Sequence, residues 1–129
     1  MANDENSERC ERKILLTAIN SAREARTLEG LVPHIKSAVD TGIEVTGLIK
    51  YNLGGFVLGE DGSPLSVEYT FLKKTVKKDF GRGYKDEEEA YKRGIEELDD
   101  ILGENCLLEV ISTSGKTQEV RIRLREPGE

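Results

Sequence analysis

The residues best suited to chemistry are basic side chains gathered in one short segment. They are Lys73, Lys74, Lys77, Lys78, Arg82 and Lys85, and a single acid, Asp79, interrupts them. Lysine and arginine neutralise the phosphates of a nucleic acid, and aromatic side chains stack against the bases of a single strand. Aromatic residues are interleaved with these cations, at Tyr69, Phe71, Phe80 and Tyr84. The segment therefore predicts a basic groove for single-stranded RNA or DNA.

The same residues also have a purely structural interpretation. Tyr69 and Phe71 alternate with polar residues, which places them on the apolar face of a strand and so in the core. Lysines on an exposed edge strand prevent it from pairing with other chains. Both interpretations are consistent with the sequence.

An acidic segment follows the basic one and supports a second function. Residues 86–104 carry nine acids against Lys92 and Arg93. Such a surface suits a protein-interaction or inhibitory module that docks onto a protein partner through its acidic helix or through a sheet edge. The net charge of −6 also argues against a protein that coats duplex DNA without sequence preference.

The sequence lacks a cluster of catalytic or metal-binding residues. His34 is its one histidine, and its two cysteines, Cys10 and Cys106, are far apart, whereas a zinc site needs several such ligands at close spacing. Residues 115–117 resemble the end of a phosphate-binding loop, but Val110 stands where that motif needs a glycine. We therefore expect a non-enzymatic binding module without a metal or another cofactor.

Cysteine content and hydropathy predict the compartment. Two widely spaced cysteines argue against a disulfide framework and favour a reducing environment. No apolar run approaches the roughly 18 residues of a membrane span, and no secretory leader is apparent. The expected location is cytoplasmic, away from membranes.

The spacing of apolar residues divides the chain into elements that belong to a single domain, residues 1–129. Residues 1–12 are polar and predict a flexible tail, and helical spacing predicts two helices within residues 13–41. Residues 43–126 predict three strands, a helix and two strands, with a loop at 80–84. The predicted strands are 43–51, 56–58, 65–71 with an extension through Val76, 107–111 and 119–124, and the helix is 86–102.

Three strands, a helix and two strands is also an order found in five-stranded oligonucleotide-binding (OB) barrels. Gly47, Gly54, Gly55 and Phe56 at the front, with Val110, Ile122 and Leu124 at the back, resemble the RNA-binding repeat of the ribosomal protein S-one type. The resemblance implies base-stacking aromatic residues on the second and third strands, which by position are Tyr51, Phe56, Tyr69 and Phe71. The expected fold is thus α+β, with N-terminal helices and an antiparallel, barrel-like (OB-like) sheet of five strands whose third and fourth are joined by the helix.

Overall fold

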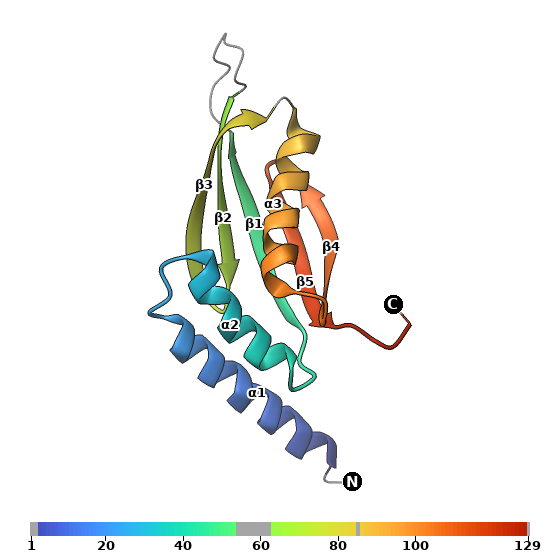
Figure 1. The fold of residues 1–129 in the computed structure, drawn as a ribbon. Coiled ribbons are helices and arrows are strands. Elements are labelled where there is room, and N and C mark those ends of the chain that lie inside the picture. The colour runs from blue at the N-terminus through green and yellow to red at the C-terminus, as the bar shows by residue number, and fades with distance from the viewer. Residues whose placement is uncertain (1–2, 54–62, 85, 129) are drawn as a thin grey trace.

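The computed structural model describes residues 3–53, 63–84 and 86–128, and the side chains of residues 9–53, 65–81 and 86–128. Three helices and five strands make up the fold, an α+β arrangement that confirms the predicted class (Figure 1). Their order is α1 (Asn3–Ala22), α2 (Leu28–Val39), β1 (Val45–Leu53), β2 (Ser63–Phe71), β3 (Lys74–Tyr84), α3 (Glu87–Leu102), β4 (Cys106–Ser114) and β5 (Thr117–Leu124). Within the described ranges, no helix has the length and apolar character needed to cross a membrane.

The two N-terminal helices form a hairpin. α1 begins at Asn3, inside the segment expected to be a tail, and packs against α2 through small apolar residues such as Ala18 and Ala22. Thr27 caps α2, because its hydroxyl accepts a hydrogen bond from the Gly30 amide at 3.0 Å. Pro33 lies in the second turn of α2.

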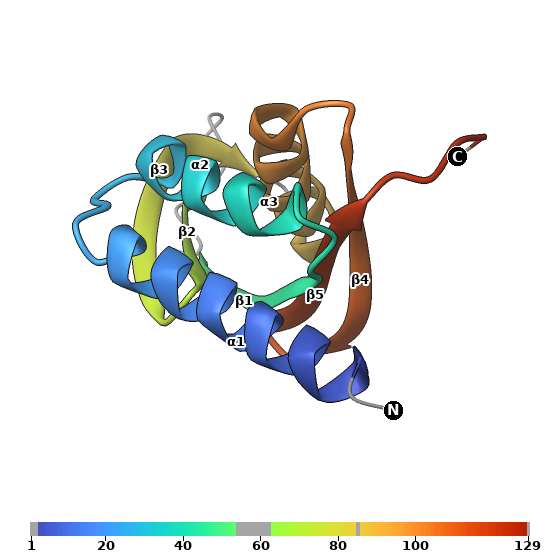
Figure 2. The ribbon, with the colours of Figure 1, turned by 90° about the horizontal axis from the view of Figure 1, so that it is seen from below.

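All five strands pair antiparallel in one sheet with the order β3-β2-β1-β5-β4. α2 and α3 cover one face of this sheet, here called the inner face, while α1 packs against α2 beyond the end of the sheet (Figures 1 and 2). The expected closure into a barrel is not observed in the described parts of the sheet, where β3 and β4 form its two edges. The two edges do not meet because α2 and α3 lie between them on the concave side of the sheet (Figure 2).

The strand boundaries correct several predictions. The strand predicted at 56–58 lies outside the described residues, and the one predicted at 65–71 is β2. Instead of continuing to Val76, the chain reverses at Leu72 and Lys73, whose φ angles are 53° and 58°. Residues 80–84, expected to be a loop, form the last part of β3.

α3 and its flanking residues follow the sequence signals closely. Asp86 caps the helix by accepting a hydrogen bond from the Glu89 amide at 2.8 Å, and Gly103 ends it with a φ of 85°. Gly94 faces the sheet, and a Cβ atom there would lie 2.6 Å from Cε1 of Tyr51. The missing side chain therefore allows α3 to lie directly on the tyrosines of the core.

Candidate nucleic-acid interface

The predicted basic segment forms β3, an edge strand, so its cations divide between the two faces of the sheet. Val76 is buried on the inner face, and the alternation of a strand places Lys74 and Lys78 on that face too. Lys77 lies on the opposite, outer face, where it is exposed and pairs across the strands with Glu68. Lys73 is exposed in the turn that precedes β3.

Lys78 is held by two carboxylates from different helices. Its ammonium group donates to Glu29 of α2 at 2.7 Å and also bonds to Glu97 of α3. The hydrogen bond from Lys78 lowers the pKa of Glu29, and the hydrogen bonds to Glu29 and Glu97 raise the pKa of Lys78. Lys78 therefore joins β3 to both covering helices, and its charge is already compensated within the protein.

Lys74 links β3 to the connection between α1 and α2. Its ammonium group donates to the carbonyl oxygen of Arg23 at 2.9 Å. This contact brings two further exposed cations, Arg23 and Arg26, to the β3 side of the molecule. Nothing in the local sequence around β3 signals these two arginines, because they lie about fifty positions earlier and only the fold brings them close.

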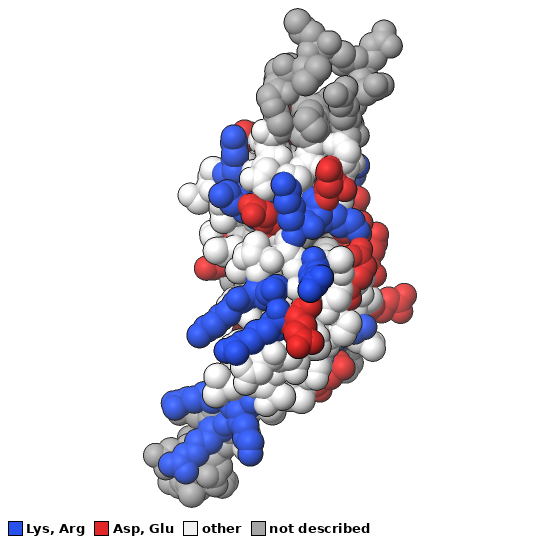
Figure 3. Space-filling view, turned by 90° about the vertical axis from the view of Figure 1, so that its left-hand side faces the viewer, with Lys and Arg blue, Asp and Glu red and all other residues white. Residues whose placement is uncertain are grey.

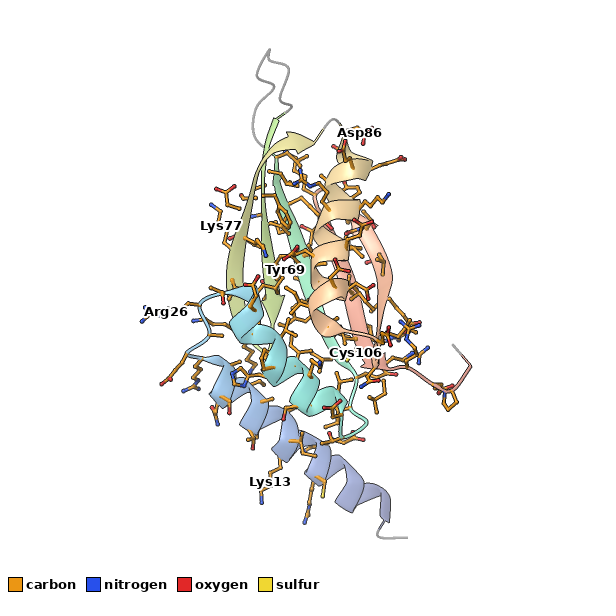
Figure 4. The ribbon with its side chains drawn as sticks, viewed as in Figure 1. Lys13, Arg26, Tyr69, Lys77, Asp86 and Cys106 are labelled. Atoms are coloured by element: carbon orange, nitrogen blue, oxygen red, sulfur yellow. The ribbon has the colours of Figure 1, made fainter. Side chains whose placement is uncertain are left out.

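We call Arg23, Arg26, Lys73 and Lys77 the basic edge surface. Figure 3 shows Lys and Arg side chains distributed over this side of the molecule, with some Asp and Glu side chains between them and more along one margin. In Figure 4, Lys77 and Arg26 project from the same side, away from α3. The structure thus gathers cations from two distant segments along one edge of the sheet.

Two shallow hollows on the outer face adjoin this surface. One, of about 320 Å³, is lined by Leu48, Thr70 and Lys73 among other residues. The other, of about 250 Å³, shares Leu48 and Thr70 with it and is also lined by Lys50. Leu48 is 44% exposed, so the hollows combine an apolar floor with hydroxyl groups and one cation each, and each also has one carboxylate in its lining, Glu119 in the first and Glu68 in the second.

The aromatic residues that were expected to stack against bases lie elsewhere. Tyr51 is only 1% exposed, and its hydroxyl lies 2.5 Å from Oε1 of Gln118 and 3.2 Å from the Tyr91 carbonyl. Tyr69 and Phe71 are equally buried, as the core interpretation of their alternation predicts. The reason is that their strands present these residues to α2 and α3, which leaves no ring face for a ligand.

The side chains of three other predicted site residues are not described by the structure. Phe56 and Lys85 lie outside the described residues, and Arg82 lies in β3 beyond the side chains that are described. Phe80 is partly buried, with the guanidinium carbon of Arg93 5.5 Å from the centre of its ring.

The rest of the described chain offers no obvious catalytic centre. Cys106 is fully buried, and burial raises the pKa of its thiol, which disfavours the reactive thiolate. Among the described residues, no group of three or more His, Cys, Asp or Glu side chains is placed to hold a metal ion. Every buried side-chain nitrogen or oxygen in that part of the chain has a hydrogen-bond partner.

Comparison of the chain with protein-family models, curated proteins and solved structures returned no match.

Proposed function

We propose that this protein is a non-enzymatic module that binds single-stranded RNA or DNA through the basic edge surface. The phosphates of the strand lie along Lys73 and Lys77 and reach Arg23 and Arg26. Parts of a nucleotide occupy the hollows around Leu48 on the outer face.

The observation that carries this proposal is the bond from Lys74 to the Arg23 carbonyl. It connects β3 with the α1–α2 connection and so places four exposed cations from two segments on one side of an otherwise acidic protein. A row of cations of this kind attracts a phosphate backbone electrostatically, whatever the base sequence. In contrast, Lys78 takes no part, because Glu29 and Glu97 already bind it.

The burial of Tyr51, Tyr69 and Phe71 determines which kind of contact can bind the strand. Proteins that grip single strands by stacking gain about 1 to 3 kcal/mol per base from exposed aromatic rings. Without those three rings, affinity for the strand comes mainly from phosphate contacts. Binding should therefore be moderate in strength, tolerant of base sequence and strongly dependent on salt.

The test is a titration of labelled single-stranded RNA and DNA at two or more salt concentrations. Two double variants each remove part of the surface: Lys73→Gln with Lys77→Gln, and Arg23→Gln with Arg26→Gln. The matched control is Lys92→Gln with Lys116→Gln, which removes the same amount of charge from exposed positions on α3 and in the β4–β5 turn.

Each surface variant should weaken binding about tenfold or more and reduce its dependence on salt. The slope of log affinity against log salt concentration changes by about 0.7 for each phosphate that the protein no longer neutralises. The control should bind like the unaltered protein. Failure of the unaltered protein to bind either nucleic acid, or an equal loss in the control, would refute the proposal.

One observation favours a second candidate function, the docking of a basic protein partner. α3 presents several exposed carboxylates, namely Glu87, Glu88, Glu96, Asp99 and Asp100. Replacing Glu96 and Asp99 by lysine should abolish such docking and leave nucleic-acid binding intact. Docking of a basic partner that persists in this variant would exclude α3 as the docking surface.

A further inference from the structure

The two edge strands of the sheet differ in how they are protected. β3 carries four lysines within Lys74–Tyr84 and its preceding turn, and lysines on an edge strand oppose pairing with another chain. β4, with the sequence CLLEVISTS, contains no lysine, arginine or proline over its nine residues. It therefore lacks the residues that usually keep an edge strand from pairing.

β4 also exposes apolar side chains. Val110 and Ile111 are each 45% exposed, although large apolar residues elsewhere in the described sheet are mostly buried. A bulge at this point, between Val110 and Ser112, shifts the register with β5. Figures 1 and 2 together show none of the described helices beside the free edge of β4, and the C-terminal segment leads away from the sheet.

The register shows which backbone groups of β4 are free to pair. The Arg125 amide donates to the Asn105 carbonyl, so these two residues face each other as a hydrogen-bonded pair. Such pairs alternate along an antiparallel ladder, with the peptide groups of the intervening residues directed outward. On the first part of β4, Cys106, Leu108 and Val110 therefore direct their N–H and C=O groups away from β5. The Cys106 carbonyl accepts a hydrogen bond from the Arg125 guanidinium at 3.4 Å, so pairing with another strand relies mainly on Leu108 and Val110.

We propose that β4 pairs with β4 of a second copy of this chain. The strands run antiparallel about a two-fold axis, so that the same surface of each copy forms the interface. The outward peptide groups of one β4 bond to those of the other, while Val110 and Ile111 lose their exposure to water. The result is one sheet that continues through both copies.

Charge favours a second copy as the partner. The sole charged residue of β4 is Glu109, and it already binds Arg121 at 3.3 Å and Arg123 at 3.0 Å. A two-fold axis at Leu108 sets Glu109 opposite Leu107 of the other copy, so that like charges do not meet.

Assembly through β4 should stop at two copies. Pairing through β4 leaves β3 as the outer edge at both ends of the joined sheet. Because β3 carries the lysines, no third copy is expected to add there. The basic edge surface then occurs twice, at opposite ends of the dimer.

Sedimentation equilibrium on the full chain over a range of concentrations tests the proposal. The unaltered protein should reach the mass of a dimer, and Val110→Lys, which gives β4 the protection that β3 has, should be monomeric. The control Leu16→Lys makes the same kind of change on α1, where Leu16 is 58% exposed, and should remain dimeric. A monomeric unaltered protein at several hundred micromolar, or a folded Val110→Lys variant that is still dimeric, would overturn the proposal.

A second measurement needs no variant and so does not depend on how Val110→Lys folds. Amide hydrogen exchange of the unaltered protein should slow at Leu108 and Val110 as its concentration rises, because these amides become bonded in the dimer. Exchange at those two amides that is independent of concentration would equally overturn the proposal.

Discussion

The ring of Phe71 lies over Gly47, its direct partner across the β1–β2 ladder. A Cβ atom at Gly47 would clash with this ring and with the carbonyl oxygen of Thr70. Both residues belong to the inner face, and Phe71 is 1% exposed. An aromatic ring that covers a glycine in this way fixes the register of two strands.

Replacing Gly47 by alanine should therefore destabilise the protein by about 1 to 3 kcal/mol, the usual cost of overpacking a core. Denaturation with urea measures the loss. Adding Phe71→Leu to Gly47→Ala should cost less than the sum of the two single changes, because the smaller side chain makes room for the new methyl group. Additive costs would show that Phe71 and Gly47 are not coupled.

Lys78 should matter more for stability than its neighbour Lys77. Lys78→Met leaves Glu29 and Glu97 without their shared cation, at the point where α2, α3 and β3 meet. Because these groups are partly exposed, we expect a loss of about 1 kcal/mol, against less than about 0.5 kcal/mol for Lys77→Met. Equal effects of the two substitutions in chemical denaturation would contradict the bridging role.

The same cluster predicts a pH dependence in acid. The pKa of Glu29 is lowered in the folded protein, chiefly by its hydrogen bond from Lys78. Its contribution to stability is thus fully present above the usual carboxyl pKa and is lost as the pH falls through the lowered value. Unfolding free energies measured through this range should decline less steeply in Lys78→Met, whereas unchanged steepness would exclude Lys78 as the cause.

The turn between β2 and β3 should gain stability from a glycine. Lys73 has a φ of 58°, a conformation that glycine adopts without strain and that favours glycine in two-residue hairpin turns. Lys73→Gly should raise the midpoint of thermal unfolding, with a gain of about 1 kcal/mol. Lys73→Ala removes the same charge but keeps the strain, so it should give no such gain.

Alkaline titration should link the ionisation of two buried tyrosines to unfolding. Burial raises the pKa of Tyr51 and Tyr69, so their neutral forms are favoured in the folded state. Unfolded tyrosines ionise near pH 10, and stability is therefore lost as the pH rises above that value. Phenolate absorbance should show these two groups ionising together with unfolding, and their ionisation in a chain that is still folded would contradict the packing.

Short-range signals explain which parts of the fold could be predicted from the sequence. Thr27, Asp86 and Gly103 mark helix ends through bonds or backbone angles within a few residues of themselves, so their residue types carry this signal in the local sequence. The turn at Leu72 and Lys73 escaped prediction, because neither residue is typical of positive φ angles. Tertiary packing holds them there. The loop predicted at 80–84 rests on Gly81 and Gly83, which instead belong to β3.

The candidate site was less predictable because it depends on contacts between distant segments. Because side chains alternate between the two faces of the sheet along β3, Lys74 and Lys78 lie on the inner face and Lys77 on the outer face. Their closeness in the sequence does not reveal this separation. The compensation of Lys78 by Glu29 and Glu97 and the approach of Arg23 both arise only once the helices pack on the sheet. The S-one resemblance and the binding of nucleic acid remain predictions.

The central position of β1 has a consequence for synthesis on the ribosome. β1 pairs with β2, its neighbour along the chain, but its other side pairs with β5, which is made only after β2, β3, α3 and β4. Contacts so distant in sequence form slowly, because a long loop must close first. While residues up to Ser114 emerge, the middle strand of the finished sheet is still an open edge, and the nascent chain is most prone to misassociate until Thr117–Leu124 arrives to cover it.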